Sequence, residues 1–595
     1  MQLYHDSHSL FYRDPFGALK CGDKVTIRVR AIGATKVYLR FYNGSEFFLP
    51  MLNTERNVYE YTLTMPEVPI LCWYDFKAVN NEGDVLCYGN NDDMLGGSGQ
   101  MTMFPRGYQI TVYDPAYDTP RFMRHGVMYQ IFPDRFYRDR APVTDREDIY
   151  LHRDWHETPA VIPGQKDPNP NGIDFFGGTL NGIAEKLPYL QSLGITVLYL
   201  NPIFKAHSNH RYDTGDYSQV DPLLGTNHDL KVLCEKAKAL GMSVMLDGVF
   251  SHTGDDSLYF NRYGNYPTVG AYQSKESKYY DWYSFEKYPD KYNSWWGFTT
   301  LPAVNKDNRR YQSFMFNKDG IVRKWIRMGT DGWRLDVADE LPMDFLRKLR
   351  KAVKAENEQA VVLGEVWEDA SHKVAYGEMR CYCQGDTLDS VMNYPLRDAL
   401  IRFLTFKLSA FGLARIITSQ KENYPAPFYY SLMNLCGSHD RARAVNYLAE
   451  CTFEDVPFKD RPGKRLTKEK YALGEGRFAM MMQMMSVLPG IPCLYYGDEI
   501  GMQGAPDPFC RGTFDWENQN TQMLNFIRDI LTRRSASQVL QTGFVKVEAL
   551  DEDVITITRY NKHGADAFGV PAADETFEMT FDRRDLPDLS GGYEG

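Results

Sequence analysis

The feature that most constrains the fold of this chain is a series of apolar runs that alternate with amphipathic helical stretches from about residue 126 onwards. The eight runs read GVMYQIFP, ITVLYLNP, MSVMLDGVF, GWRLDVAD, AVVLGEVW, LDSVMNYP, FYYSLMNLCGSHD and IPCLYYGDE. Strands that are apolar on both faces are typical of parallel sheets covered by helices. Eight successive strand-then-helix units favour a closed (β/α)8 TIM barrel over an open sheet.

The segments around these units predict further domains. Residues 1–120 contain KVTIRVRAI and KVYLRFY, which alternate apolar and polar residues between Asn-Gly and Gly-Asn turn signals, so an N-terminal β-sandwich is expected. The catalytic barrel is expected over 121–537. It includes an inserted domain B, rich in Tyr, Trp, Asp and Asn, at about 253–316 after the third strand. Alternation returns in VITITRYN, so 538–595 is expected to form a short C-terminal β domain. The fold class is therefore α/β.

Charge and composition argue against several classes of protein. Lys and Arg number 67 and Asp and Glu 78, giving a net charge of −11, whereas nucleic-acid binding requires a clustered basic surface. No run approaches the ~18 apolar residues of a transmembrane helix, so no membrane partner is expected.

The start, MQLYHDSHSLFYRDPFG, has no basic head followed by an apolar run. No signal peptide is therefore expected, and a cytoplasmic location is the hypothesis. The 10 cysteines lack CxxC spacing and are expected to be free thiols.

Polar residues follow the apolar runs at the end where barrel enzymes carry their active sites. Strand four ends with Arg334 and Asp336, strand five with Glu365, and strand seven with His439 and Asp440. Such charges are costly to gather unless they are paired or used in chemistry. Paired carboxylates suit glycoside cleavage, because one protonates the leaving oxygen and the other handles the oxocarbenium-like carbon. No GxSxG elbow, HExxH, P-loop or post-strand GxGxxG occurs, which argues against serine hydrolases, zincins and nucleotide-binding proteins.

Four separated motifs resemble the α-amylase family of retaining glycoside hydrolases. They are DGVFSH at 247–252, GWRLDVADE at 332–340, GEVWE at 364–368 and GSHD at 437–440. The resemblance implies that Asp336 is the nucleophile, Glu365 the general acid/base and Asp440 the carboxylate that stabilises the transition state. Arg334, two residues before Asp336 on the same strand face, would orient it and lower its pKa, while Glu365 must stay protonated.

The same resemblance assigns residues that bind substrate. His252 and His439 would donate to hydroxyls of the sugar at the cleavage point. Further motifs resemble the neopullulanase, cyclomaltodextrinase, maltogenic amylase and amylopullulanase group; they are SNHRYDTGDY at 208–217, LPAVN at 301–305, Trp295-Trp296 and DPFCR at 507–511. They imply that Tyr212 stacks under the sugar ring and that Asp507, Arg511 and Trp296 also bind substrate. The N-terminal sandwich resembles a starch-binding module that often contributes to a dimer, so a homodimer through this domain is one expectation.

Two departures from the family concern calcium. Ser251 stands where the family commonly has an Asn that ligates calcium, and GGT at 177–179 stands where the group often has GGD. Asp145, Glu147 and Asp148 after the first strand are left as candidate ligands, since calcium takes about 6–8 oxygens. No residue is therefore assigned to a metal, no cofactor is expected to be required, and calcium remains open.

These observations predict a retaining α-glucan hydrolase. Its substrates would be maltooligosaccharides, cyclodextrins or pullulan, cleaved at α-1,4 bonds, with α-1,6 bonds as a further candidate. The carboxyl groups of Asp336 and Glu365 are expected roughly 5–5.5 Å apart, as in retaining enzymes. A transglycosylase, in which a sugar hydroxyl resolves the glycosyl-enzyme, remains an alternative. A non-catalytic glucan-binding protein is a further alternative, which the loss of a catalytic carboxylate would indicate.

Overall fold

The structure is a computed structural model that describes residues 1–587 and 589, and in this part of the chain the eight apolar runs form one parallel barrel. Its strands in chain order are β13 (Met128–Ile131), β16 (Val197–Leu200), β19 (Ser243–Gly248), β22 (Gly332–Leu335), β23 (Val361–Gly364), β26 (Ser390–Val391), β27 (Met433–Leu435) and β28 (Ile491–Tyr495). Their order in space is β26-β23-β22-β19-β16-β13-β28-β27, and a parallel bridge between Met392 and Met433 joins the two ends. The predicted (β/α)8 barrel is confirmed.

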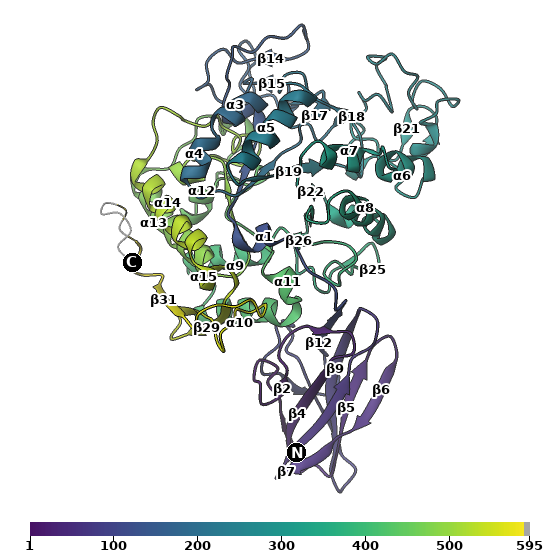
Figure 1. Cartoon of the computed structure of the whole chain (residues 1–595), viewed down its shortest axis with the longest axis vertical. Coiled ribbons are helices and arrows are strands. Elements are labelled where there is room, and N and C mark those ends of the chain that lie inside the picture. The colour runs from purple at the N-terminus through teal and green to yellow at the C-terminus, as the bar shows by residue number, and fades with distance from the viewer. Residues whose placement is uncertain (588, 590–595) are drawn as a thin grey trace.

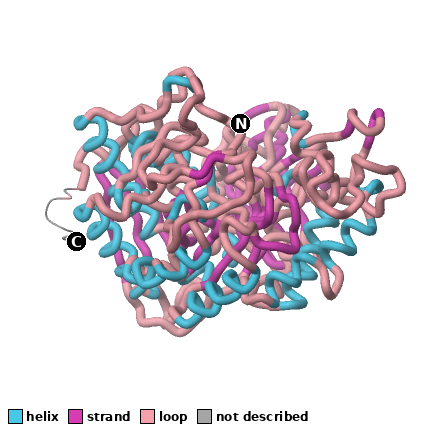
Figure 2. The backbone as a smooth tube through the Cα atoms, turned by 90° about the horizontal axis from the view of Figure 1, so that it is seen from above, coloured by secondary structure: helices cyan, strands magenta, loops and turns pink. Residues whose placement is uncertain are grey.

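Helices surround the barrel strands on the outside (Figure 2). The longer ones are α5 (Asn227–Ala239), α6 (Arg309–Phe316), α7 (Ile321–Arg327), α8 (Met343–Glu356), α9 (Tyr394–Leu404), α10 (Ala410–Asn423), α13 (Lys468–Val487) and α14 (Thr521–Ala536). Two shorter helices precede β16, namely α3 (Leu180–Glu185) and α4 (Leu187–Ser192), with Pro188 near the start of the second. Proline has no N–H for the helical ladder, so it suits a first turn and not a helix interior.

Shorter elements complete the barrel region. The short helices are α1 (Arg121–His125), α2 (Pro133–Phe136), α11 (Ala426–Tyr429), α12 (Ala444–Leu448) and α15 (Gln538–Thr542). The single-turn helices are η1 (Tyr280–Trp282), η2 (Trp295–Gly297), η3 (Ala338–Glu340), η4 (Phe458–Asp460) and η5 (Asp498–Ile500). Small strand pairs are β14 (Tyr150–Leu151) with β15 (Asp174–Phe175), β17 (Phe204–Ala206) with β18 (Thr214–Val220), β20 (Phe285–Lys287) with β21 (Lys291–Tyr292), and β24 (Val374–Ala375) with β25 (Glu378–Met379).

An N-terminal β-sandwich lies below the barrel and is drawn in purple in Figure 1. One sheet contains β1 (Gln2–Tyr4), β2 (Arg13–Asp14), β4 (Lys24–Ile32), β7 (Leu52–Glu55) and β8 (Val58–Thr64). The other contains β3 (Leu19–Lys20), β5 (Lys36–Tyr42), β6 (Glu46–Pro50), β9 (Ile70–Val79), β10 (Val85–Gly89), β11 (Gln100–Thr102) and β12 (Tyr108–Tyr113). Val25, Ile27 and Val29 alternate along β4 into the core between the sheets, as the period of two requires.

The sandwich is joined to the barrel by buried polar contacts. Arg13 donates to Glu422 of α10 over 2.6 Å, and a ring nitrogen of His8 lies 3.1 Å from the other oxygen of the same carboxylate. Thr111 of β12 also donates to the backbone oxygen of Asn423 over 2.6 Å. A buried ion pair needs its partners in fixed positions, so these contacts orient the sandwich against α10.

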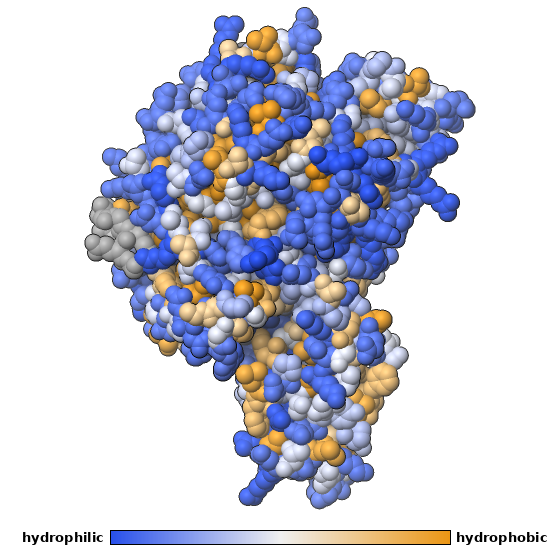
Figure 3. All heavy atoms as spheres, in the orientation of Figure 1, coloured by the Kyte–Doolittle hydropathy of each residue, from blue (hydrophilic) through white to orange (hydrophobic). Residues whose placement is uncertain are grey.

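The chain closes with a small antiparallel sheet of β29 (Phe544–Ala549), β30 (Val554–Tyr560) and β31 (Thr576–Asp582), which lies beside α10 in Figure 1. The last residues of the expected C-terminal domain, 588 and 590–595, lie outside the described residues. Hydrophilic residues cover most of the face seen in Figure 3. Within the described chain, no helix combines the length and apolar character needed to cross a membrane.

Candidate active site

The three predicted catalytic carboxylates follow barrel strands at their carboxyl ends. Asp336 comes directly after β22 and Glu365 directly after β23, and both backbone N–H groups continue the strand ladder, to the oxygens of Gly248 and Leu335. Asp440 follows β27 in the GSHD loop. Parallel strands end at one mouth, so the barrel brings these side chains to a common site.

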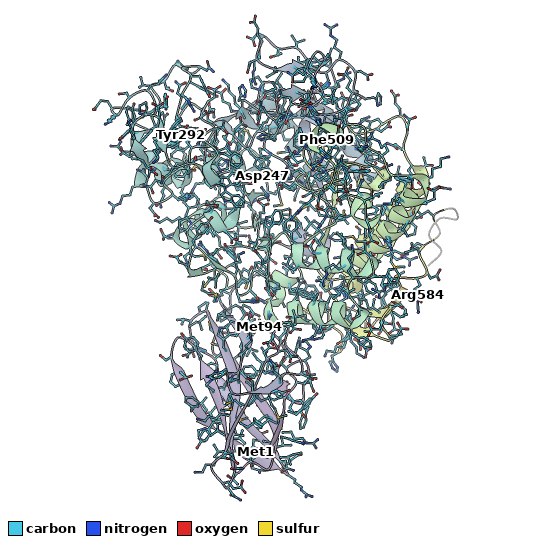
Figure 4. All side chains as sticks on the ribbon, turned by 180° about the vertical axis from the view of Figure 1, so that it is seen from behind. Met1, Met94, Asp247, Tyr292, Phe509 and Arg584 are labelled. Carbon is cyan, nitrogen blue, oxygen red and sulfur yellow. The ribbon has the colours of Figure 1, made fainter. Side chains whose placement is uncertain are left out.

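Arg334 of β22 is the buried cation on which the acidic groups converge. Its Nη1 donates to Asp247 Oδ1 over 2.9 Å and to Asp336 Oδ1 over 3.1 Å. Its Nη2 forms an ion pair with Glu365 Oε2 at 2.7 Å. The guanidinium side chain is only 1% exposed. Figure 4 labels Asp247 near the middle of the barrel domain. One planar, permanently charged group therefore fixes both the predicted nucleophile and the predicted acid.

The pKa of Asp336 differs from the sequence expectation. Burial raises it well above its ordinary range, Arg334 opposes that rise, and the nearby carboxylates, Glu365 first, add to it. Arg334 acts in the expected downward direction, but burial outweighs it, so the expected net lowering of the pKa of Asp336 does not occur. Burial also raises the pKa of Glu365, again against Arg334. Two carboxyl groups so placed titrate as a pair, and a pair that holds one proton supplies one acid and one nucleophile.

Glu365 is held by two further donors. The backbone N–H of Val337 donates to Oε2 over 2.9 Å, and Trp367 Nε1 donates to Oε1 over 3.1 Å. Trp367 is itself fixed by flat stacking on Tyr394, with ring centroids 4.5 Å apart and planes 8° apart. Because both oxygens are held, the carboxyl group keeps one orientation toward the cleft, as proton transfer to a fixed leaving oxygen requires.

Asp440 lies beside His439, Arg511 and Asp507. Its Oδ1 is 3.2 Å from His439 Nε2 and 3.7 Å from Arg511 Nη2, and about a third of its side chain remains exposed. Arg511 also pairs with Asp507 at 2.8 Å and donates to the backbone oxygen of His439 over 2.9 Å. The predicted pair Asp507–Arg511 therefore forms and positions the loop that carries Asp440.

His439 is a neutral donor packed flat against Tyr212. Burial, with the Arg511 and Arg334 charges, holds the pKa of His439 well below its usual value. Gln130 Nε2 donates to its Nδ1 over 2.9 Å, so Nε2 carries the proton. The Tyr212 ring stacks on the imidazole at 5.2 Å with planes 6° apart, and its hydroxyl donates to Asp247 over 2.8 Å. These contacts give Tyr212 a fixed ring and His439 a fixed N–H.

His252 is also buried and neutral. Burial lowers its pKa to about 4. Its Nδ1 lies 2.9 Å from the Ser251 hydroxyl and its Nε2 lies 3.1 Å from the backbone oxygen of Tyr212. Ser251, which replaces the calcium-ligating Asn of the family pattern, therefore serves as the partner of His252.

A cavity of about 720 Å³ contains this group of residues. Its lining includes nine of the ten predicted site residues: Asp336, Glu365, Asp440, Tyr212, His252, His439, Asp507, Arg511 and Trp296. The tenth, Arg334, is buried among the carboxylates. The size is that of a small-ligand site, and the aromatic walls suit the C–H faces of sugar rings.

Sequence reasoning left out several residues of the site. Asp247 and Gln130 hold Arg334 and His439 from within the barrel, and Trp367 holds Glu365. Trp367 belongs to the GEVWE motif, which was the signal available for it. Glu340, the last residue of the GWRLDVADE motif, also lines the cavity, as does Tyr376, which no motif indicated.

The candidate calcium ligands do not fit a metal site. Asp148 is paired with Arg146 at 2.6 Å and with His207 at 2.9 Å, and Asp145 and Glu147 are exposed. Across residues 1–587 and 589, no group of three or more His, Cys, Asp or Glu side chains is placed to hold a metal ion. Arg146 and His207 thus lie against Asp148 where a calcium ion would need carboxylate oxygens.

Comparison with known proteins places this site in a family. Residues 130–550 match the family model described as the catalytic domain of alpha amylase. The amylopullulanase of Thermoanaerobacterium saccharolyticum is 37% identical over an alignment of 635 positions, which covers 98% of this chain and 48% of that protein. This chain therefore spans about half the length of that relative. The cyclomaltodextrinase of Thermoanaerobacter pseudethanolicus is 31% identical over 544 residues, covering 87% of this chain and 84% of that protein.

Solved structures agree with this assignment. The cyclic alpha-maltosyl-(1→6)-maltose hydrolase from Arthrobacter globiformis, in complex with its cyclic substrate, superposes with a TM-score of 0.63 at 31% identity, covering 75% of this chain and 90% of that one. A cyclomaltodextrinase superposes with a TM-score of 0.65 at 26% identity and covers 94% of this chain and 89% of that one. The family match over residues 130–550 and the barrel with its converging carboxylates lead to one conclusion: this chain belongs to the alpha-amylase family.

Proposed function

We propose that this chain is a retaining α-glucan hydrolase that cleaves α-1,4 bonds, and α-1,6 bonds as well, in maltooligosaccharides, cyclodextrins or pullulan. The observation that carries the proposal is the pair Asp336 and Glu365 on one guanidinium, inside a 720 Å³ cavity with aromatic walls. The names of the relatives support the substrate class, because they include amylopullulanase, neopullulanase and cyclomaltodextrinase.

In the proposed mechanism Asp336 attacks the anomeric carbon while Glu365 gives its proton to the glycosidic oxygen. The carbon–oxygen bond breaks, the leaving glucan departs with the proton, and a covalent glycosyl-enzyme remains on Asp336. Glu365, now ionised, takes a proton from water, and the hydroxide attacks the same carbon and frees Asp336. Two inversions give net retention of the α configuration.

The remaining site residues bind and orient the sugar in this mechanism. The neutral Nε2–H of His439, which lies 2.5 Å from the Tyr212 hydroxyl, also donates to a sugar hydroxyl in the bound state, and Asp440 accepts from the sugar hydroxyls and opposes the positive charge that develops on the ring. Asp440 is not shielded by a direct hydrogen bond from Arg511, whose Nη2 is 3.7 Å away, so it keeps acceptor capacity for substrate. Tyr212, His252, Asp507, Arg511 and Trp296 complete the cleft lining.

The test of this function is a panel of maltotriose, cyclodextrin, pullulan and panose with analysis of the products. We expect hydrolysis of at least one of them, and proton NMR of the first product should show the α anomer. A β anomer would refute retention, and binding of these sugars without turnover would indicate the non-catalytic alternative. Products longer than the starting sugar would indicate transglycosylation.

Three finer properties belong to the same proposal. We propose that turnover needs no metal, supported by the contact of Ser251 with His252 and by the contacts of Asp148 with Arg146 and His207. We propose a cytoplasmic site of action, supported by the free thiols of the ten cysteines, as is usual in a reducing compartment. We further propose a homodimer through the N-terminal sandwich, supported by exposed Phe47, Phe48 and Leu52 on β6 and β7. Sedimentation of wild type and of Phe48→Glu would test the dimer, since a charge on exposed β6 should favour monomer.

A further inference from the structure

A second cavity, of about 320 Å³, lies on the barrel domain and shares no lining residue with the catalytic cavity. Its lining is drawn from three segments: residues 156–159 between β14 and β15, residues 461–471 around the start of α13, and residues 500–520 between β28 and α14. Cavities that hold small molecules begin at about 300 Å³. The second cavity is therefore large enough for a small ligand.

One loop forms a wall of both cavities. Asp507 and Arg511 line the catalytic cavity, whereas Gly504 and Phe509 line the second cavity. The loop is held in place, because the N–H of Gly504 donates to Asn446 Oδ1 over 2.9 Å. Figure 4 labels Phe509 on the barrel domain. The second cavity is thus a separate space on the other side of this loop, with its own chemistry.

Three cations line the second cavity without a carboxylate partner. They are Arg461, Lys464 and Arg465, and none of them forms an ion pair within the described part of the chain. Arg461 donates to the backbone oxygens of Val456 and Glu454, both over 2.9 Å, which fixes its guanidinium and leaves Nη1 unused. Lys464 and Arg465 are exposed. Three positive charges are therefore left for an anion to balance.

The two carboxylates that line the second cavity already have partners. Glu157 Oε2 lies 2.5 Å from His152 Nδ1. Asp515 accepts at Oδ1 from the backbone N–H of Asn518 over 2.9 Å. The lining therefore carries an excess of positive charge, although the whole chain has a net charge of −11. A cleft lined mainly by one sign of charge concentrates ions of the opposite sign.

The rest of the lining offers neutral polar groups. Gln503 Oε1 accepts from the backbone N–H of Leu466 over 2.8 Å, which fixes the amide, while its Nε2 has no hydrogen-bond partner in residues 1–587 and 589. Thr158 and Asn518 also line the cavity. Amide and hydroxyl groups pair with the hydroxyls of a sugar. The lining has no exposed Phe, Tyr or Trp ring on which a nucleotide base would stack.

We propose that the second cavity binds the phosphate monoester of a small sugar. Arg461, Lys464 and Arg465 contact the phosphate, since guanidinium groups pair with phosphate oxygens and an ammonium adds a point charge. Gln503 and its neutral neighbours contact the sugar hydroxyls. The cavity is larger than a phosphate ion alone would fill, so the sugar contributes to binding. This site is distinct from the catalytic cavity and does not depend on the proposed hydrolysis.

The test is titration calorimetry of the full chain with glucose 6-phosphate, glucose, inorganic phosphate and AMP. We expect glucose 6-phosphate to bind at least about tenfold more tightly than each of the others, because it alone presents both a phosphate and a sugar of matching size. Its affinity should fall when NaCl is raised from about 50 to about 300 mM, since exposed charges are screened. Equal binding of glucose would overturn phosphate recognition. Equal binding of inorganic phosphate or AMP would overturn sugar recognition, and no binding of any probe would reject the site.

The double variant Lys464→Gln/Arg465→Gln locates the binding. Both side chains are exposed, so the fold should be kept, and we expect the dissociation constant of glucose 6-phosphate to rise at least about fivefold. Arg309→Gln/Lys351→Gln is the matched control. Arg309 and Lys351 are also an exposed arginine and lysine without an ion pair in the described residues, but they line a different groove, of about 360 Å³. The control should bind within about twofold of wild type. An equal loss in both double variants, or no loss in the first, would overturn the site.

A competition experiment separates the second cavity from the catalytic one. Asp336→Asn, which is expected not to turn over sugar, is titrated with glucose 6-phosphate in the presence and absence of excess maltoheptaose. Because the two cavities share no lining residue, the dissociation constant should stay within about twofold. Displacement of glucose 6-phosphate by maltoheptaose would place the phosphate in the catalytic cavity and refute the second site.

Discussion

Replacing Arg334 by methionine removes the only cation that contacts both Asp336 and Glu365 in the described part of the chain. The side chain keeps a similar length but carries no charge, and the buried carboxylate of Asp247 loses its partner as well. The change therefore isolates the electrostatic role of the guanidinium from the rest of the cleft.

The size of the expected pKa change follows from the distances between Arg334 and the two carboxylates. A cation within ~4–6 Å of a carboxylate lowers its pKa by about 1–3 units, and Arg334 lies within 3.1 Å of Asp336 and 2.7 Å of Glu365. Burial raises the pKa of both carboxyl groups, and Arg334 opposes that rise. Without Arg334, both pKa values therefore rise further. We expect the acidic limb of kcat/KM to move up by about one to two pH units. Loss of a buried partner should also cost about 3–5 kcal/mol of stability near neutral pH.

The sign of the stability effect is fixed by the direction of the pKa change. Carboxyl groups whose pKa is raised on folding favour the fold while they are protonated. Their contribution is complete below the unfolded pKa of about 4 and is lost as the pH rises through the raised value in the folded state. Arg334→Met should therefore be closer to wild type in thermal stability at pH 5 than at pH 8.

The assay is kcat/KM on maltotriose from pH 4 to 9, with thermal midpoints at pH 5 and pH 8. Arg334→Lys keeps a charge and should leave the acidic limb near wild type while losing rate through poorer geometry. Arg350→Met is the control: Arg350 pairs with the buried Asp389 at 2.5 Å, and Asp389 keeps Lys354 at 3.0 Å. An acidic limb that stays in place in Arg334→Met, or that moves equally in Arg350→Met, would refute the reasoning.

Three further predictions concern the proposed chemistry. Asp336→Asn should keep its circular dichroism and lose more than about 99% of turnover, since an amide is a poor nucleophile; greater residual activity would reject the assignment. Glu365→Gln should be nearly inactive on maltotriose yet still be glycosylated by α-maltosyl fluoride, whose leaving group needs no proton, and equal loss on both would exclude it as the acid. EDTA should leave the rate of wild type nearly unchanged, and a loss that calcium restores would contradict metal-independent turnover.

The barrel could be predicted because each of its strands is buried on both faces. Runs such as ITVLYLNP and AVVLGEVW have no polar side, and few folds other than a parallel barrel accept eight of them in series. The contact between Arg334 and Asp336 could be predicted too. The two residues are two positions apart on one strand, so their side chains share a face. The local sequence pattern was sufficient to predict side-chain positions wherever the backbone forms a regular strand.

The direction of the pKa shift of Asp336 could not be predicted in this way. The sequence indicated one Arg beside one Asp, and an isolated pair would lower the pKa. The structure brings Asp247, from a neighbouring strand, and Glu365 onto the same guanidinium, and burial then outweighs the pairing. The number of groups that share a partner is a property of the tertiary fold.

Loop residues were missed for a related reason. Tyr376 and Glu340 are 36 residues apart in segments without a periodic pattern, and the contact of the Tyr376 hydroxyl with Glu340 is made only in the folded chain. The candidate calcium ligands Asp145, Glu147 and Asp148 show the same dependence on contacts that are distant in the sequence. Acidic residues close in sequence were paired with, or separated by, partners such as His207 that the local pattern does not show.

The charge balance of the cleft bears directly on catalysis. Asp247 accepts from Tyr199 over 2.6 Å, from Tyr212 over 2.8 Å and from Arg334 over 2.9 Å, so its negative charge is the best satisfied of the three buried carboxylates. The single positive charge of Arg334 is then largely balanced by Asp247. Asp336 and Glu365 together can hold one negative charge and one proton without a further cation. In the proposed mechanism, the positive charge that develops on the sugar ring compensates the one negative charge of this pair, so the pair interacts more favourably with the transition state than with the substrate.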